Sequence, residues 1–296
     1  MGDRWMHIGG YDVCPWSISG VETCVVVKAD GIRIAFDMGY SLQESVGCDH
    51  VFISHGHMDH ISGVVQHAAK RALCKMRAAS YYIPDHLVET VRTVEEGFLK
   101  MAEKTSIIEK MNIIPVISGQ QVDLPRGYYV EPFLTVHCVK SNGYLLYKKY
   151  YTLKEEYQGV EGRELSAMKR NGIEIHDITT VPEVAYMGDT KFDVFHNPPI
   201  EDILKVKLLI TETTYIDTGH PGRMDLEKLA KERGHSHLFD FITNEHLFCY
   251  VESILFIHFS QKYSREYIES YILTNLPKTL KDKVHLGILA LDYKKP

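Results

Sequence analysis

The chain has 296 residues, of which 45% are hydrophobic and 24% are charged. This composition excludes a disordered, collagen-like or disulfide-stapled chain, because it allows a full-sized core to be buried. The 33 Lys and Arg and the 39 Asp and Glu give a net charge of −6, which argues against nucleic-acid binding through bulk charge. A partner with a phosphate backbone would therefore have to be held by local basic patches.

The sequence shows no sign of a membrane or secreted protein. No apolar run approaches the roughly 20 residues that cross a bilayer, and Met1–Arg4 is too polar to begin a signal peptide. The six cysteines are scattered without a C-x-x-C pair, which is typical of reduced thiols. We therefore expect a cytosolic protein that has no contact with a membrane.

Short strands are expected in the first third of the chain, where β-branched and apolar runs are separated by Gly or Asp turns. They span residues 22–27, 32–36 and 50–54. A change to helical spacing then predicts a helix from Asp85 to about Asn112, with Asp85 as its N-cap.

The rest of the chain alternates between strand and helix patterns. Strands are expected at 128–136, 184–187, 207–211, 253–257 and 284–291, and helices at 225–233, 238–247 and 263–274, the last capped by Ser264. This alternation, confined to the second half, predicts one α/β layered domain with mixed sheets. The segment 140–181 fits neither pattern, is rich in Tyr and Lys, and is interpreted as an inserted arm.

Six apolar runs end in a side chain that can bind a metal. These terminal residues are Asp37, His55, His137, Asp189, Glu212 and His258. One such residue alone would be read as a satisfied polar group at a strand end. Six together indicate a single site assembled from rigid elements, as preorganised metal sites are.

The densest cluster of metal-binding residues is His55-Gly56-His57-Met58-Asp59-His60. Imidazoles and a carboxylate without thiolate suit Zn²⁺, and Mn²⁺ or Fe²⁺ also tolerate this set. Four ligands cannot saturate two metals, so His137, Asp189 and His258 are the natural remainder. The alternative, a polar loop without metal, is disfavoured by the spacing.

With the later histidines and aspartate in order, this cluster resembles the metallo-β-lactamase-fold hydrolases. Within that superfamily the chain resembles tRNase Z, the tRNA 3′-end endonucleases, in the short form found in plants. The narrower resemblance rests on segments 141–144, 188–190, 234–236 and 258–263. It covers nearly the whole chain and implies an αββα sandwich over residues 1–296, with the metals at one edge of two sheets. It also implies a homodimer and a tRNA-binding arm at about 140–181.

The resemblance also implies roles for individual residues. Two Zn²⁺ would be held by His55, His57 and His137 on one side, by Asp59, His60 and His258 on the other, and by Asp189 between them. Asp37 would orient the histidine loop. Water activated by the two ions would attack a phosphodiester, with Asp59 accepting its proton. Glu212 would hold the His235 imidazole in its charged form, and His235 would protonate the leaving oxygen. The expected reaction removes the 3′ trailer from precursor tRNA and leaves a 3′-hydroxyl. Taken alone, His235 would be a loop histidine before a helix capped by Ser236.

The chain departs from the family pattern in three places. The usual His-Glu-Ala-Thr box reads Thr211-Glu212-Thr213-Thr214, so the glutamate is kept and the histidine is replaced. The Pro-x-Lys-x-Arg-Asn segment linked to reading the tRNA 3′ end is replaced by residues 14–20. The arm also lacks the usual double proline.

Basic residues gather in the arm despite the negative net charge. Residues 140–170 hold seven cations and four glutamates, a balance of +3, with tyrosines among them. Such a mixture favours contact with RNA phosphates and ribose. The candidate RNA-binding residues are Lys140, Lys148, Lys149, Lys154, Arg163, Lys169 and Arg170. A second patch, Lys70, Arg71, Lys75 and Arg77, is equally well explained as a solvated face.

Other functions share part of this pattern. A small-molecule thioester or ester hydrolase of the same fold would need the metals but neither the arm nor the pair of His235 and Glu212. A silent RNA-binding or scaffold protein is disfavoured by the complete ligand set, and a metal store by its open arrangement.

Overall fold

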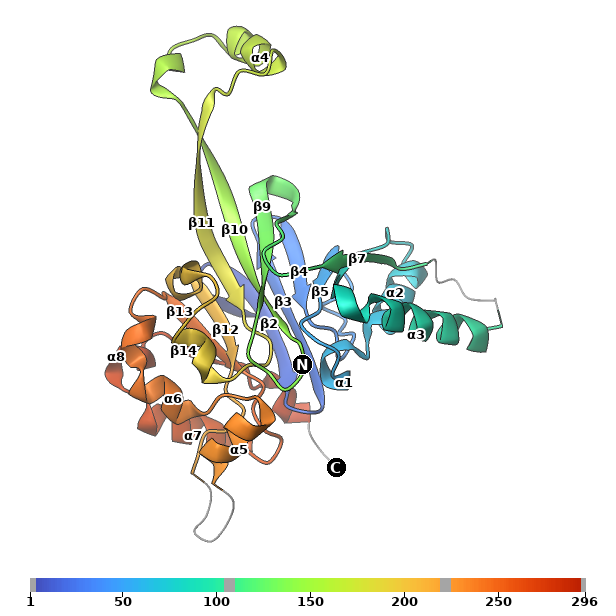
Figure 1. Ribbon diagram of the computed structural model, residues 1–296, viewed down its shortest axis with the longest axis vertical. Coiled ribbons are helices and arrows are strands. Elements are labelled where there is room, and N and C mark those ends of the chain that lie inside the picture. Colours follow the sequence, from blue (N-terminus) through green and yellow to red (C-terminus); the bar gives the residue numbers. More distant parts are fainter. Residues whose placement is uncertain (1–3, 104–109, 219–224, 294–296) are drawn as a thin grey trace.

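A computed structural model describes residues 4–103, 110–218 and 225–293, which form two mixed sheets packed face to face (Figure 1). The first sheet runs in chain order through β1 (Met6–Ile8), β2 (Tyr11–Ile18), β3 (Glu22–Ala29), β4 (Ile32–Phe36), β5 (His50–Phe52), β6 (Ser80–Pro84) and β7 (Asn112–Val116). The second runs β14 (Val284–Leu286), β13 (Ser253–Ile257), β12 (Leu208–Glu212), β11 (His176–Tyr186), β10 (Asn142–Leu153), β9 (Tyr128–Leu134) and β8 (Val122–Asp123).

Each sheet is antiparallel in one half and parallel in the other. Strands β1 to β4 pair antiparallel and β4 to β7 pair parallel. In the second sheet, β8 to β11 pair antiparallel and β11 to β14 pair parallel. Because parallel strands present their carboxyl ends at one edge, each sheet gathers several chain segments at a common edge.

Alternating side chains divide the interior into an inner layer and two outer layers. In β4, Ile34 and Phe36 join the core between the sheets, whereas Ala35 faces the outer layer. In β13, Leu255 and Phe256 divide in the same way. This period of two is the expected result of the pleat, since successive side chains point to opposite faces.

Helices cover the two outer faces. Helices α1 (Met58–Ile61), α2 (Val64–Leu73) and α3 (Val88–Met101) lie beside the first sheet (Figure 1). Helices α5 (Leu226–Arg233), α6 (Leu238–Thr243), α7 (Arg265–Asn275) and α8 (Lys278–Lys281) gather beside the second. The mixed αββα sandwich predicted from the sequence is therefore confirmed. None of the helices in the described ranges has the length and apolar character required to cross a membrane.

The predicted arm is an ordered extension of β10 and β11. Figure 1 shows the two strands leaving the body as a ribbon that carries α4 (Gly162–Arg170) at its tip. The interpretation of 140–181 as an arm that fits no strand pattern is wrong for Tyr144 to Tyr147, which are buried in the second sheet. The alternation there was concealed because apolar residues occupy both faces of a strand covered on both sides.

Several element boundaries differ from those predicted. The helix from Asp85 ends at Met101, residues 104–109 lie outside the described residues, and Asn112 begins β7. Asp85 is not its cap, since Leu87 occupies that position and the Asp85 carboxylate binds Lys140 at 3.2 Å. The strand expected at 284–291 stops at Leu286 and is followed by a 3₁₀ turn.

The helical caps in the second half agree better with the sequence. Ser264 caps α7 as predicted, accepting the Tyr267 amide at 3.2 Å. Helix α6 starts after His237, which is its cap, so the interpretation of Ser236 as a cap is wrong. The Ser236 hydroxyl instead donates to the Thr190 carbonyl at 2.8 Å. The predicted strands at 22–27, 32–36, 50–54, 128–136, 207–211 and 253–257 are found with small changes of boundary.

Candidate metal centre

The carboxyl ends of five strands bring the candidate ligands to one edge of the sandwich. Asp37 follows β4 and His55 follows β5, while Asp189 follows β11, Glu212 ends β12 and His258 follows β13. All five are buried. Rigid, apolar strand bodies thus hold side chains that are far apart in sequence at fixed positions.

The seven candidate ligands form adjoining groups whose nitrogen and oxygen atoms lie within 4.8 Å of one another. One group contains His55, His57, His137 and Asp189, the second Asp59, His60 and His258, and a third joins Asp189 and His258 to His235. Asp189 lies between the first two, with Oδ2 3.9 Å from His55 Nε2 and 3.3 Å from His60 Nε2.

Hydrogen bonds on the outer side fix how the imidazoles are protonated. His137 Nδ1 lies 2.8 Å from the Gly234 carbonyl, which can only accept, so this nitrogen carries the proton. His60 Nδ1 lies 2.7 Å from the Asp37 carboxylate, and the same reasoning applies. In both rings Nε2 faces the cluster and offers a lone pair when the ring is neutral. This is the usual way in which a ligand histidine is oriented.

Two hydroxyl relays orient the remaining Nε2 ligands. The Ser54 hydroxyl donates to Asp37 and accepts from His55 Nδ1 at 2.9 Å. The Thr214 hydroxyl donates to Glu212 and accepts from His258 Nδ1 at 3.1 Å. Both rings therefore also direct an unprotonated Nε2 inward.

The inward atoms fit a pair of divalent cations. His55 Nε2 lies 2.9 Å from His57 Nδ1, and His60 Nε2 lies 3.2 Å from His258 Nε2. Facing lone pairs repel, and a metal ion between them removes the repulsion. A nitrogen and carboxylate set without thiolate is the donor chemistry that Zn²⁺, Mn²⁺ and Fe²⁺ share.

The electrostatics of the cluster also favour positive charge. Burial opposes a charge on His60, but Asp189 and Asp37 raise the pKa of His60 well above its usual value. Burial would raise the pKa of Asp189, but the imidazoles of His258 and His60 hold it well below the ordinary range. Burial, followed by the neighbouring His60, lowers the pKa of His55 and keeps it neutral.

The Asp37 carboxylate accepts hydrogen bonds from both sides of the histidine loop. Its Oδ1 accepts the Ser54 amide at 2.7 Å and its Oδ2 accepts the Tyr186 hydroxyl at 2.5 Å, in addition to His60. The backbone also packs closely against the histidine loop, since a Cβ at Gly39 would overlap the Asp59 carbonyl. A Cβ at Gly234 would lie 2.6 Å from His137 Nδ1.

His235 and Glu212 form a pair beside the cluster. His235 Nδ1 lies 2.8 Å from Glu212 Oε1 and 3.9 Å from Asp189 Oδ2. Burial lowers the pKa of His235, but the Glu212 carboxylate overcomes this and raises it to about 9. The imidazole is therefore charged at neutral pH and can donate a proton.

Glu212 is held by more groups than the sequence indicated. Its carboxylate accepts the Thr190 amide at 2.9 Å, the Ser236 amide at 3.2 Å and the Thr214 hydroxyl at 2.6 Å. Sequence reasoning missed Ser54, Thr214 and Tyr186, because hydroxyl residues are common and their partners lie on other strands. The altered box Thr211-Glu212-Thr213-Thr214 was the one available signal for Thr214.

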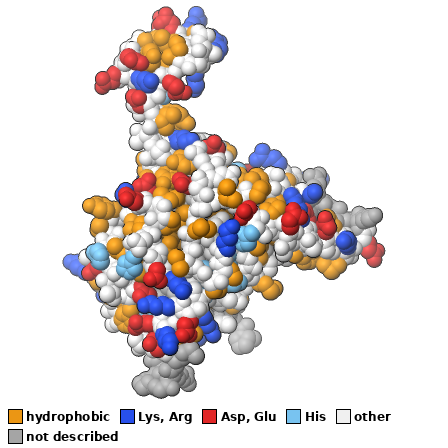
Figure 2. Space-filling view, viewed as in Figure 1, with side chains coloured by type: hydrophobic (Ala, Val, Ile, Leu, Met, Phe, Trp, Pro, Cys, Tyr) orange, Lys and Arg blue, Asp and Glu red, His pale blue; other side chains and the backbone are white. Residues whose placement is uncertain are grey.

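The candidate RNA-binding residues fall into two groups. Lys140 lies in the loop between His137 and β10, whereas Lys148 and Lys149 lie where the arm leaves the body; the three are paired with Asp85, Asp30 and Asp123 at 3.1–3.4 Å. Arg163, Lys169 and Arg170 lie on α4 at the tip and are exposed, with Lys154 at the end of β10. Figure 2 shows cationic and acidic side chains together at this tip.

The second basic patch is partly internal. Arg71 is buried and donates to the carbonyls of Val46, Cys48 and Arg77 and to Asp49. Its interpretation as a surface cation is wrong, because the guanidinium completes the hydrogen bonding of loop carbonyls that have no strand partner.

Known proteins resemble this chain in both sequence and fold. A family model described as "Anti-Pycsar protein Apyc1" matches residues 30–187, more than half of the chain. The protein tRNase Z TRZ1 of Arabidopsis thaliana is 35% identical over 279 residues, covering 94% of this chain and 95% of that protein. The chloroplastic tRNase Z TRZ2 of the same plant is 30% identical, covering 97% of this chain and 77% of its own.

Solved structures agree with the fold. Human tRNase Z, short form, superposes with a TM-score of 0.53 at 17% identity, covering 92% of this chain and 93% of its own. The metallo-β-lactamase-fold protein YhfI of Bacillus subtilis superposes with a TM-score of 0.56 at 15% identity. The match covers 92% of this chain and 94% of the YhfI chain. At such identities the likeness shows the metallo-β-lactamase fold alone. The sequence matches go further: this chain falls within the family that the Apyc1 model describes and belongs to the tRNase Z family of metallo-β-lactamase-fold nucleases.

Proposed function

We propose that this protein is a zinc-dependent endoribonuclease that removes the 3′ trailer from precursor tRNA and leaves a 3′-hydroxyl. The observation that carries the proposal is the meeting of two ligand groups with a charged His235 at the carboxyl edge of both sheets. The relatives named tRNase Z supply the substrate class.

Two metal ions are proposed, held as the sequence resemblance assigns them. His55, His57 and His137 would hold the first, Asp59, His60 and His258 the second, and Asp189 would contact both. When bound, such ions lower the pKa of a water molecule and neutralise charge on a phosphodiester.

Asp59 is proposed to take the proton of the attacking water. Its Oδ2 is held by the Gly20 amide at 2.8 Å and lies 3.3 Å from His258 Nε2. Its burial would raise the pKa of Asp59, but the His258 and His60 imidazoles lower it, so the carboxylate enters the reaction ionised.

His235 is proposed to give a proton to the leaving ribose oxygen. A ribose alkoxide is a poor leaving group, so a positioned acid accelerates its departure. Glu212 keeps the imidazole charged and fixes its Nδ1, which leaves Nε2 for the substrate.

The arm is proposed to bind the body of the tRNA. The exposed cations Arg163, Lys169 and Arg170 suit contact with phosphates, which sets position rather than sequence. Lys148 and Lys149 at its base contribute less, because their charges are already offset by carboxylates.

A homodimer is also proposed. Helix α3 leaves Val94, Phe98 and Met101 between 46% and 71% exposed, an apolar stripe that a second copy could bury. Phe98→Glu should shift a dimer to monomer in sedimentation equilibrium, whereas Thr93→Glu on the same helix should not.

The cytosol is the proposed compartment, supported by six cysteines that form no disulfide within the described residues. A fluorescent fusion confined to another compartment would contradict it.

The central test offers the purified protein a 3′-extended precursor tRNA and, separately, a glutathione thioester. We expect cleavage of the RNA alone, with a 3′-hydroxyl on the tRNA product. Chelation and Asp59→Ala should abolish it, and Asp12→Ala, which removes an exposed carboxylate paired with His7, should not. Thioester hydrolysis without RNA cleavage would refute the proposal in favour of a small-molecule hydrolase.

A further inference from the structure

At the base of the arm, Glu183 interrupts the pairing of its two strands. Leu146 of β10 pairs with Val184 of β11, and the next residue, Tyr147, pairs with Pro182. Glu183 is therefore left without a partner in the register, as the extra residue of a β-bulge. Such bulges bend a ribbon and redirect a side chain.

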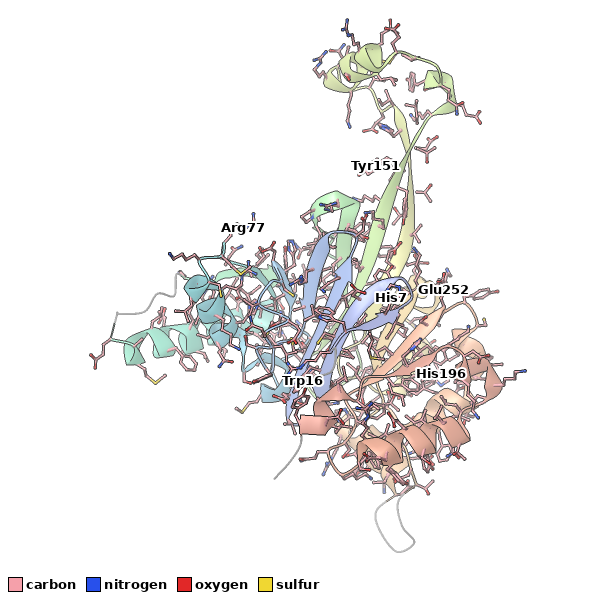
Figure 3. The ribbon with its side chains drawn as sticks, turned by 180° about the vertical axis from the view of Figure 1, so that it is seen from behind. His7, Trp16, Arg77, Tyr151, His196 and Glu252 are labelled. Atoms are coloured by element: carbon pink, nitrogen blue, oxygen red, sulfur yellow. The ribbon has the colours of Figure 1, made fainter. Side chains whose placement is uncertain are left out.

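The bulge lies where the support of the second sheet ends. Towards the body, β11 is paired on both sides, with β10 and with β12 from Leu208 onward. Beyond Glu183, residues His176 to Pro182 pair with β10 alone. The pairing of β10 with β9 ends at Lys148, so β10 from Lys149 to Leu153 is paired with β11 alone and spans about 17 Å at the usual rise per residue. Tyr151 lies on this ribbon, clear of the sandwich (Figure 3).

The redirected carboxylate is buried and has three partners. Glu183 is 3% exposed. Lys207, which directly precedes β12, places Nζ 2.9 Å from Oε1 and 3.1 Å from Oε2. The Tyr11 hydroxyl donates to Oε2, and the Tyr150 hydroxyl reaches Oε1 at 3.4 Å.

These partners come from three separate parts of the fold. Tyr11 begins β2 in the first sheet, Lys207 enters β12 of the second, and Tyr150 lies on the arm itself. The β1–β2 turn fits closely against this point, since a Cβ at Gly9 would lie 3.1 Å from the Lys207 carbonyl. A two-stranded ribbon is marginal without such support.

We propose that Glu183, with Tyr11 and Lys207, is a positioning element that fixes the direction of the arm relative to the metal centre. It thereby determines which precursor RNAs reach that centre. The inference rests on the proposed function, because it assigns the arm to RNA binding. A buried carboxylate retained at a bulge is otherwise costly, and here its charge is used to join the arm to both sheets.

The test uses the metal-loaded protein and compares Glu183→Gln and Tyr11→Phe with Glu201→Gln. The last variant removes the same charge from an exposed pair with Lys205 and serves as the matched control. For precursor tRNA we expect Glu183→Gln to raise KM about tenfold with kcat changed less than about twofold, which corresponds to removal of one charged hydrogen bond. Hydrolysis of bis(p-nitrophenyl) phosphate should be unchanged. Tyr11→Phe should give a smaller change in the same direction.

Hydrogen exchange supplies an independent readout. Amides of Lys149 to Leu153 should exchange faster in Glu183→Gln and at the wild-type rate in Glu201→Gln, while amides of β12 and β13 stay protected. If the wild-type protein fails to bind or cleave precursor tRNA, the proposed function fails, yet this exchange pattern still tests the anchoring. Unchanged exchange, or a parallel loss of small-substrate hydrolysis, would overturn the inference, as would faster exchange with an unaltered KM.

Discussion

His235, which lies just after the end of α5, meets Glu212 at the end of β12, with Nδ1 2.8 Å from Oε1. Because Glu212 raises the pKa of His235 to about 9, the acid form persists at neutral pH and is lost as the pH rises through that value. Glu212→Gln should therefore move the basic limb of the rate profile on precursor tRNA to lower pH. A limb that stays in place would argue against His235 as the acid.

His235→Ala should lower kcat on precursor tRNA by about 10²–10⁴, the usual contribution of a positioned acid. The same variant should lose little on bis(p-nitrophenyl) phosphate, because its leaving group departs without a proton. Equal losses on both substrates would assign His235 to the metal site instead. His196→Ala, which changes a histidine outside the candidate metal groups, is the control for loss of an imidazole.

Asp37→Asn should weaken metal binding about 10–100-fold, as expected for a carboxylate that orients a ligand histidine. The neutral asparagine amide cannot accept the hydrogen bonds of His60, Ser54 and Tyr186 as the Asp37 carboxylate does. Competition with a chromogenic chelator measures the affinity without reference to activity. Asp49→Asn is the control, since Asp49 lies outside the candidate metal groups and binds Arg71. Undiminished affinity in Asp37→Asn would show that the histidine loop is held by its backbone alone.

The cations at the arm tip should act through phosphates. Replacing Arg163, Lys169 and Arg170 with alanine should weaken tRNA binding and reduce the slope of log affinity against log salt, by up to about one unit for each phosphate that is no longer bound. Replacing the paired Lys148 and Lys149 should change the slope less. An unaltered slope in the triple variant would place the RNA elsewhere.

Removal of the whole arm requires a different boundary from the one that the sequence suggests. Since Tyr144 to Tyr147 are part of the buried sheet, a deletion of the whole segment 140–181 would damage the core. Joining Lys149 to Thr180, which face each other in the register, removes the ribbon alone. The shortened protein should hydrolyse bis(p-nitrophenyl) phosphate normally and bind tRNA at least about tenfold more weakly. Equal losses would deny the arm a role specific to RNA.

The buried ring of His67 makes the free energy of unfolding depend on pH in the acid range. Burial lowers the pKa of His67 to about 4, and its ring is held by the Tyr81 hydroxyl at 2.8 Å and the Ser45 carbonyl at 3.0 Å. The folded state thus favours the neutral ring. Its contribution is complete above the unfolded pKa of about 6.5 and is lost as the pH falls towards 4, by about 3 kcal/mol in total. Urea unfolding of wild type and His67→Gln between pH 7 and 4 should show a smaller pH dependence in the variant.

The sequence alone identified the candidate ligands because their chemistry is local. A tight His-x-His-x-Asp-His cluster and apolar runs ending in Asp or His indicate metal binding wherever they lie in space. The strands 32–36 and 253–257 were found because their apolar bodies are short and bounded by turns. The order of these ends along the chain also carried the family resemblance, which the comparisons confirm.

Only the tertiary structure decided which side chains meet. Arg71 looked like a surface cation until the carbonyls of a distant loop were placed around it. Thr214 and Ser54 became relays, and Glu183 an anchor, because strands remote in sequence lie side by side. Pairing partners, burial and bulges depend on packing between separate segments, and a linear pattern of residue types carries no record of those distances.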